Sequence, residues 1–252
     1  MSEWYETFFD ALAFDVWRAL VPGPVTEAEA TFLLRHLAPT EGRRRLLDVP
    51  SGDGRLALPV AAAGHDVVAV DRSPVAVERL RRQMAASGTA VTVRSGDMRD
   101  LDRALAGMAP FDGAWCMGNS FGYLGALDTR TFVEGLAGWL RPGARFVLDA
   151  AIVAECVLPA LGGDDRYEVG DAVLVSANSY DARSSAMVTE MTLRAGSRED
   201  KRVVRHRVMT CREIVDLLEE AGLAVEGIYG GLDGEEFGVG APRCLVVATR
   251  RV

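Results

Sequence analysis

The sequence is poor in histidine and cysteine and lacks any long apolar run. Its 252 residues include three histidines and four cysteines, and the cysteines are scattered without the paired spacing of metal ligands. We expect them to be small buried side chains in a reducing compartment. No uninterrupted apolar stretch reaches the ~18 residues of a transmembrane helix. No basic start precedes an apolar run, so no secretory signal is expected. The prediction is a cytoplasmic protein.

Basic residues are also fewer than acidic residues in this sequence. Lysine and arginine number 28 against 36 aspartate and glutamate residues, which gives a net charge of −8. Because duplex nucleic acid is bound through a basic stripe that releases counterions, nucleic acid is not an expected partner. The expected partner is a small-molecule acceptor, with no nucleic acid and no membrane, and a homo-oligomer stays open. A composition of 49% hydrophobic and 25% charged residues is typical of a globular domain.

The N-terminal part of the sequence is rich in aromatic residues. Residues 3–20 have helical spacing but are apolar on more than one side. Such a helix is either part of the core or a lid over a ligand site. Pro22–Pro24 ends this helix, and the capping box of Thr26 and Glu29 predicts a second helix that runs to Leu37.

From Arg45 onward, short apolar strands alternate with helical segments. This alternation predicts an α/β fold, a parallel sheet with helices on both faces. Residues 166–210 break the alternation with three strand-like runs, which predict a small antiparallel β cap. Four regions are therefore expected: an N-terminal helical lid (1–40), an α/β core (41–160), an antiparallel β substrate cap (161–210) and a C-terminal completion of the core sheet (211–252).

A glycine-rich turn follows the first predicted strand, between Asp48 and Arg55. Glycine lets the backbone approach a ligand without a Cβ in the way, and in open α/β sheets ligands bind beyond the carboxyl ends of the strands. Gly52-x-Gly54-x-x-Ala57 also satisfies the dinucleotide-binding pattern. The sequence of this turn alone therefore does not distinguish a nucleotide-binding turn from a purely structural one.

Acidic residues end the next two predicted strands. Asp71 can accept hydrogen bonds from both hydroxyls of a ribose, and Asp97 can accept from an adenine amino group, although a simple turn is the alternative for Asp97. The fourth strand then leads into a loop dense in polar and aromatic residues, 111–123. Together these features predict an adenosine-binding edge of the sheet.

These motifs resemble those of the class I methyltransferases that use S-adenosylmethionine (SAM). The resemblance is close over residues 45–150 and looser from there to the C-terminus. It rests on the motifs Leu47–Arg55, Val70–Pro74, Gly96–Arg99, Phe111–Tyr123 and Leu140–Gly143. It implies a Rossmann-like, seven-stranded, mostly parallel sheet whose last strand is antiparallel. It also implies an enzyme with SAM as its cofactor, of the bacterial small-molecule methyltransferase type.

The resemblance assigns a cofactor site. Asp48 and the turn of residues 50–54 would flank the methionine part of SAM, Asp71 the ribose, and Asp97 and Met98 the adenine. The implied cofactor residues are Asp48, Pro50, Ser51, Gly52, Gly54, Arg55, Asp71, Arg72, Asp97, Met98, Met117, Gly118 and Asn119. Pro50 departs from the glycine usual in the family. Since proline removes a donor and fixes φ, this departure affects the contact to the amino-acid end of SAM.

The acceptor is expected between the loop of residues 119–123 and the β cap. The candidate acceptor-binding residues are Trp4, Tyr5, Asn119, Ser120, Tyr123, Arg183 and Arg205. His206 is a candidate base, with a buried structural histidine as the alternative, and Tyr123 is a second candidate. A divalent metal that acidifies the hydroxyl is a further alternative, for which Asp149 is the one ligand to name.

The reaction predicted from the sequence is methylation of a small polar molecule, on the hydroxyl of a sugar-like acceptor. The alternatives are N-methylation of a small amine, a nicotinamide-dependent oxidoreductase with the same glycine turn, and a SAM-binding module without catalysis. Asp48 before the turn, and the absence of a separate Tyr-x-x-x-Lys constellation, disfavour the oxidoreductase.

Overall fold

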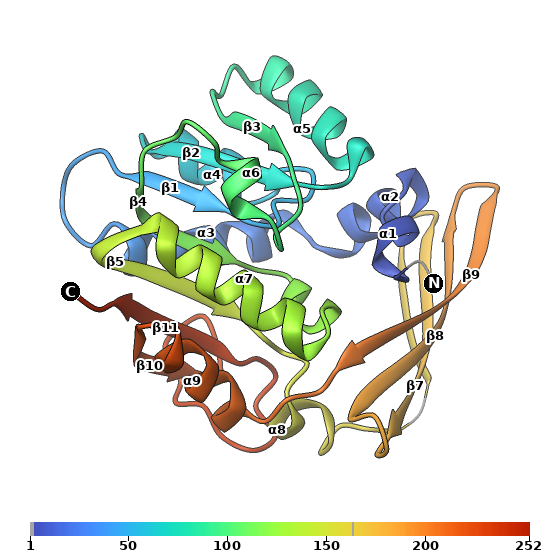
Figure 1. Ribbon diagram of the computed structural model, residues 1–252. Helices are drawn as coiled ribbons and strands as arrows, with labels where there is room; N and C mark the ends of the chain where they lie inside the picture. The colour runs from blue at the N-terminus through green and yellow to red at the C-terminus, as the bar shows by residue number, and fades with distance from the viewer. Residues whose placement is uncertain (1–2, 163) are drawn as a thin grey trace.

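The chain folds around a seven-stranded sheet, with a four-stranded sheet beside it (Figure 1). The computed structural model describes residues 3–162 and 164–252. The order of the main sheet is β10-β11-β5-β4-β1-β2-β3. Its strands are β1 Arg45–Asp48, β2 Asp66–Asp71, β3 Thr92–Ser95, β4 Phe111–Cys116, β5 Leu140–Asp149, β10 Leu223–Tyr229 and β11 Leu245–Arg250. β1 to β5 pair in parallel and β11 is antiparallel to both neighbours. The predicted Rossmann-like sheet is confirmed.

Helices cover both faces of the main sheet (Figure 1). On one face, Phe32 and Leu80 join the apolar core, and on the other Phe132 and Ile214 do so. The first face carries α3 Gly23–Leu37, α4 Ala57–Ala62 and α5 Pro74–Ser87, and the second carries α6 Leu101–Ala104, α7 Ala126–Trp139 and α9 Cys211–Glu220. Both faces of the central strands are therefore buried under helices, which explains the continuous apolar runs of these strands.

The second sheet forms the predicted antiparallel β cap. Its order is β6-β7-β8-β9, with β6 Asp164–Val169, β7 Ala172–Asp181, β8 Ala186–Ala195 and β9 Arg198–Arg207. The sequence predicts three of these strands and misses β6, whose residues are all exposed. An exposed, charged edge strand has no buried face, and so it lacks the alternation that identifies a strand.

The N-terminal segment is two helices rather than the single helix predicted over residues 3–20. The helices are α1 Tyr5–Phe8 and α2 Ala11–Leu20, and the side chain of Asp10 caps the second by accepting from the Ala13 N–H. Figure 1 shows both helices between the main sheet and the cap. In α2, Leu12 and Val16 pack against Met191 of β8, so this segment has a core of its own with the cap.

The next helix also starts earlier than predicted. The break predicted at Pro22–Pro24 is present, since α2 ends at Leu20, but Gly23 and Pro24 already form the first turn of α3, a position that proline fits. No helix within the described residues is long and apolar enough to cross a membrane. Cys116, Cys156, Cys211 and Cys244 are buried and free.

Candidate active site

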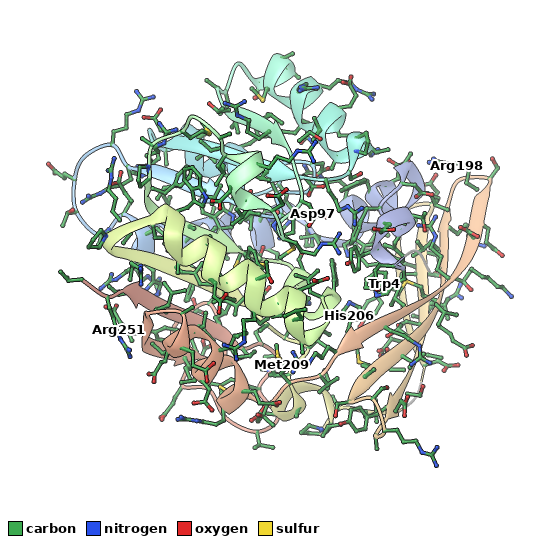
Figure 2. All side chains as sticks on the ribbon, viewed as in Figure 1. Trp4, Asp97, Arg198, His206, Met209 and Arg251 are labelled. Carbon is green, nitrogen blue, oxygen red and sulfur yellow. The ribbon has the colours of Figure 1, made fainter. Side chains whose placement is uncertain are left out.

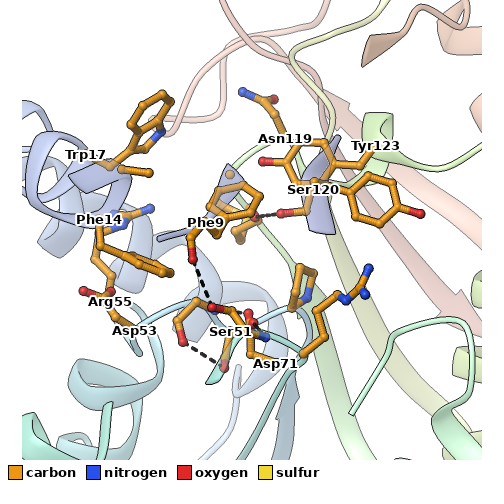
Figure 3. A pocket seen from close by; sticks show the side chains of 18 of the residues that line it. Phe9, Phe14, Trp17, Ser51, Asp53, Arg55, Asp71, Asn119, Ser120 and Tyr123 are labelled. Atoms are coloured by element: carbon orange, nitrogen blue, oxygen red, sulfur yellow. Dashed lines mark hydrogen bonds between the residues drawn. The ribbon is translucent and has the colours of Figure 1, made fainter. Parts of the chain in front are cut away.

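A cavity of about 790 Å³ lies at the carboxyl ends of β1, β2, β4 and β5. The aromatic side chains of Phe9, Phe14 and Trp17 come from the N-terminal helices, and the loop of residues 119–123 lies across from them (Figure 3). This volume lies within the range of about 300–1,000 Å³ that is typical of sites for small molecules and cofactors.

Asp71 ends β2 on the floor of the cavity. Its two carboxylate oxygens accept the backbone N–H groups of Gly52, at 2.7 Å, and of Ser73, at 2.8 Å. Burial raises the pKa of Asp71 to about 6, although these two donors act in the opposite direction. A carboxylate oxygen has two lone pairs, so each one retains the capacity to accept a further hydroxyl donor.

Asp48 ends β1 and is also buried. Burial and the nearby negative charge of Asp71 raise the pKa of Asp48 well above its ordinary value, while Arg55 acts against the shift. Two neighbouring strand ends therefore bring two buried carboxyl groups to one side of the cavity. A bound cation relieves the repulsion between them.

The turn after β1 connects these two aspartates. The N–H of Ser51 donates to the carbonyl of Val70 at 2.9 Å, so the turn with Pro50 is fastened to β2. Gly52 has a φ of +55° and lines the cavity. Gly54 does not line it; a Cβ there would lie 2.2 Å from Cδ1 of Leu80. Gly54 thus serves close packing of the turn on α5.

Asp97 lies beyond the end of β3, with Arg99 beside it. Its oxygens accept from the backbone N–H and Nε of Arg99 at 2.9 and 3.0 Å, and from Nη2 at 2.8 Å. Burial raises the pKa of Asp97, but the bonds from Arg99 outweigh it and hold the pKa below its ordinary value. Asp97 is therefore a fixed acceptor beside Met98 in the cavity lining.

The loop after β4 is held by the residues that follow β5. The N–H of Gly118 donates to Asp149 at 3.2 Å, and the amide oxygen of Asn119 accepts from the Ala151 N–H at 2.8 Å. Asn119 has a φ of +64°, a left-handed conformation that asparagine tolerates better than most residues. The loop is thus fastened at the point where it presents Ser120 and Tyr123 to the cavity.

Most of the residues predicted for the site meet in this cavity. Those that line it are Asp48, Pro50, Ser51, Gly52, Arg55, Asp71, Arg72, Asp97, Met98, Met117, Gly118, Asn119, Ser120, Tyr123 and Tyr5. Those placed outside the lining are Gly54, Trp4, Arg183, Arg205 and His206.

His206 and Trp4 lie behind the cavity wall. The rings of Trp4 and His206 are 5.2 Å apart and each packs against Tyr123, which itself lines the cavity. Figure 2 shows Trp4 and His206 where β9 passes the N-terminal helices. Burial lowers the pKa of His206 to about 4, and its Nδ1 has no hydrogen-bond partner among the described residues. The ring is thus neutral near pH 7.

The two arginines predicted for acceptor binding lie on the cap. Arg183 is in the turn between β7 and β8, where its N–H donates to Asp181. The side chain of Arg205 is exposed and lies 3.8 Å from the carboxylate of the same aspartate. Both therefore belong to the surface of the cap.

Sequence reasoning misses several residues of the lining. Phe9 and Phe14 come from the aromatic-rich N-terminal segment, whose inward face the sequence does not specify. Glu29 and Arg243 come from opposite ends of the chain, and Glu29 reads in sequence as part of a capping box. In the structure, Arg243 pairs with Glu29 and with Asp149, both at 2.7 Å. No sequence signal connects these three residues, because only the fold brings them together.

The residues at the cavity fit SAM. The buried carboxyl groups of Asp71 and Asp48 provide acceptors for ribose hydroxyls and for a cationic amino-acid end. Val75 and Met98 provide an apolar wall for a flat ring. Among the described residues, a Cβ added at Gly52 would come within 4 Å of one side chain, the ring of Phe14 at 3.8 Å. Across residues 3–162 and 164–252, no cluster of three or more His, Cys, Asp or Glu side chains is arranged to hold a metal ion.

Comparison with known proteins identifies the domain. Residues 46–143 match the protein family described as "Methyltransferase domain". Cypemycin N-terminal methyltransferase of Streptomyces is 28% identical over 218 residues, which cover 84% of this chain and 85% of that protein. Glycine/sarcosine N-methyltransferase of Parasynechococcus marenigrum is 33% identical over 124 residues, 49% of this chain, and the match spans only 41% of that relative's length.

Solved structures share the whole fold. The CcbJ methyltransferase of Streptomyces caelestis superposes with a TM-score of 0.80 at 22% identity and covers 98% of this chain and 99% of its own. The SAM-bound amino pentose methyltransferase CalS10 of Micromonospora echinaspora superposes with a TM-score of 0.72 at 24% identity, covering 96% and 97%. At these identities the likeness establishes the fold, including the β cap and the N-terminal helices.

Proposed function

This chain belongs to the class I SAM-dependent methyltransferases, and we propose that it methylates an amine nitrogen on a small, polar, sugar-like molecule. The sequence alone favours a hydroxyl acceptor and keeps the amine as an alternative. The chemistry of the cavity lining favours the amine.

The main support for this proposal is the lack of a suitable base for a hydroxyl acceptor in the described lining of the cavity. A hydroxyl oxygen becomes a good nucleophile only when a base removes its proton, whereas a neutral amine has a free lone pair. Burial raises the pKa of Tyr123 and of Tyr5, so neither phenol is a ready proton acceptor. His206 lies outside the lining. The described lining residues thus include no histidine, and ordinary carboxylates are weaker bases than an imidazole.

The charge of the lining supports the same choice. Carboxyl groups outnumber guanidinium groups, and such a surface attracts cations. The carboxyl groups are those of Glu6, Asp10, Glu29, Asp48, Asp53, Asp71, Asp97 and Asp149, and the guanidinium groups are those of Arg18, Arg55, Arg72 and Arg243. This field favours an amine that approaches as an ammonium ion, which releases its proton to solvent before the neutral nitrogen reacts, and it disfavours an anionic acceptor.

The similar proteins support nitrogen as the acceptor atom. Two of the relatives, cypemycin N-terminal methyltransferase and glycine/sarcosine N-methyltransferase, are N-methyltransferases by name. CalS10, which shares the fold over nearly the whole chain, is an amino pentose methyltransferase. The sugar-like part of the proposal rests on this last likeness together with the polar loop of residues 119–123.

The residues of the chain have two tasks in this reaction. SAM supplies an electrophilic methyl group on a positively charged sulfur. Asp48 and Asp71 hold the cofactor and offset part of its charge, and the rings of Tyr5, Phe9 and Tyr123 form a wall that excludes water from the acceptor side. A large part of the rate then comes from holding the nitrogen in line with the methyl carbon. The methylated nitrogen afterwards releases a proton to solvent.

A matched pair of acceptors tests the proposal. The methyl glycoside of an aminopentose and the same glycoside with a hydroxyl in place of the amine differ only at the reacting group. We expect formation of the demethylated cofactor, S-adenosylhomocysteine, with the amine and background rates with the hydroxyl compound. Turnover of the hydroxyl compound alone would overturn the proposal and return the reaction to O-methylation.

A further inference from the structure

We propose that the carboxylate of Asp149 is the binding group for the acceptor's amino group. This inference rests on the proposed N-methylation and adds to it a recognition site for one chemical class, an amine with at least one N–H.

Asp149 is one end of a buried chain of alternating charges along the cavity. Nη1 of Arg55 lies 2.5 Å from the carboxylate of Glu29, the other oxygen of Glu29 lies 2.7 Å from Arg243, and Arg243 lies 2.7 Å from Oδ2 of Asp149. All four residues line the cavity. Each inner member is held between two opposite charges, and Arg243 in turn holds the carboxylate of Asp149 through Oδ2.

The two oxygens of Asp149 differ sharply. Oδ2 accepts from Arg243 at 2.7 Å and from the N–H of Gly118 at 3.2 Å. Oδ1 is buried and has no hydrogen-bond partner among the described residues. The residue as a whole is 3% exposed. A buried acceptor without a donor is costly, and the cost is removed when a ligand in the cavity supplies the donor.

The place of Asp149 points to the acceptor rather than to the cofactor. The cofactor residues Asp48 and Asp71 end β1 and β2, whereas Asp149 ends β5, on the far side of β4 from both. The loop after β4, with Asn119 and Ser120, lies between these two parts of the cavity. A nitrogen bound at Oδ1 of Asp149 therefore approaches from the acceptor side.

This contact also leaves the nitrogen reactive. A neutral primary amine has two N–H donors and one lone pair. When one N–H donates to Oδ1, the lone pair remains free to face the methyl group. The bond that forms is nitrogen to methyl carbon, the bond that breaks is methyl carbon to sulfur, and the product ammonium then releases one of its N–H protons to solvent. Asp149 positions the amine and takes no part in the covalent change.

Equilibrium binding tests the inference independently of turnover. The titration uses the methyl glycoside of an aminopentose as probe and the protein loaded with S-adenosylhomocysteine. Asp149→Asn is compared with wild type and with Asp66→Asn, whose exposed side chain pairs with Arg43 at the opposite end of the sheet. Loss of a charged hydrogen bond predicts that Asp149→Asn binds the amine about 10- to 100-fold more weakly. We expect the affinity for S-adenosylhomocysteine to be unchanged and Asp66→Asn to match wild type.

Three results would overturn the inference: no binding of the amine by the wild-type chain, equal amine affinity in Asp149→Asn, or weakened binding of S-adenosylhomocysteine with the amine unaffected. The last would assign Asp149 to the amino group of the cofactor. Asp149→Glu keeps the charge and gives an intermediate affinity, so it provides the readout if Asp149→Asn does not fold. Wild-type turnover of the amine, measured separately, reports on the proposed function alone.

Discussion

The backbone N–H of Gly52 donates to the carboxylate of Asp71 at 2.7 Å, and this bond joins the turn after β1 to the end of β2. One side chain thus fixes the turn after β1 and keeps further lone pairs for hydroxyl donors. We propose that Asp71 is the residue on which cofactor binding depends most directly.

Asp71→Asn is expected to weaken the binding of S-adenosylhomocysteine about 10- to 100-fold, since it removes a charged acceptor of hydroxyl donors. Isothermal titration calorimetry measures the change, with Asp66→Asn as a control for an exposed aspartate of the same strand. Equal affinity in wild type and Asp71→Asn would remove Asp71 from the cofactor site.

The pH dependence of binding gives a second test of Asp71. Its pKa is raised to about 6 in the folded chain. If ribose hydroxyls donate to the ionised form, the affinity for S-adenosylhomocysteine is full above pH 6 and falls as the pH drops below 6. The free energy of unfolding of the unliganded chain changes in the opposite direction. It decreases as the pH rises from about 4 to about 6, because the folded state binds the proton of Asp71 more tightly than the unfolded state does. Calorimetry at pH 5 to 8 should show the first effect in wild type and a smaller one in Asp71→Asn, where Asp48 remains as a buried carboxyl group with a raised pKa.

Gly54→Ala is expected to lower the free energy of unfolding by about 2–4 kcal/mol, from a left-handed backbone and from overpacking. Gly54 has a φ of +82°, and its added Cβ would lie 2.2 Å from Leu80. Gly88→Ala is the matched control, because its φ is +70° with no atom within 4 Å of the new Cβ, so the backbone cost of about 1 kcal/mol acts alone. Urea denaturation measures both. Equal losses would show that the contact with Leu80 has no cost.

The N-terminal helices are expected to act as a lid. Arg18 of α2 pairs with Asp53 of the cofactor turn at 3.0 Å, and Arg202 of β9 pairs with Asp10 at 2.8 Å, so this segment is fastened to both core and cap. S-adenosylhomocysteine should slow hydrogen exchange over residues 3–20, where Trp4, Tyr5 and Trp17 lie. Arg18→Met should reduce this protection. Exchange rates that do not respond to the ligand would make these helices a plain part of the core.

Variants of Tyr123 and His206 distinguish the role of a residue that lines the cavity from that of a residue behind the cavity wall. Tyr123→Leu removes a ring from the lining and should lower kcat for the amine at least tenfold, at unchanged affinity for S-adenosylhomocysteine. His206→Phe keeps the packing against Trp4 and Tyr123 and should keep kcat within about twofold. A large loss of kcat in folded His206→Phe would instead support the base predicted from the sequence.

The main sheet is predictable because its strands are buried on both faces and end at turn-forming residues. β6 is not, since Asp164–Val169 pairs with β7 through backbone alone and exposes its side chains. The break between α1 and α2 also cannot be predicted from the sequence pattern. The apolar spacing continues through it, although Asp10 caps α2 by accepting from the Ala13 N–H, and Phe8 and Leu12 on either side of Asp10 share one apolar cluster with the β cap.

Most of the residues predicted for the cofactor line the cavity because they follow strand ends, where topology places ligands. The residues proposed for the acceptor are harder to predict. Arg243 reaches Asp149 and Glu29 from the loop before β11, and neither pairing has a local pattern. His206 alternates with valines as a buried residue does, but the alternation does not say whether the ring reaches the cavity or packs behind it.

Intramolecular competition tests the central claim most directly. An aminopentose glycoside offers an amine and hydroxyls to the same cavity in one molecule, and SAM labelled with ¹³C at its methyl group marks the atom that is methylated. Heteronuclear NMR correlation of the product then assigns the labelled carbon to nitrogen or to oxygen. The account predicts label on nitrogen alone. Label on oxygen would contradict it and establish the chain as an O-methyltransferase.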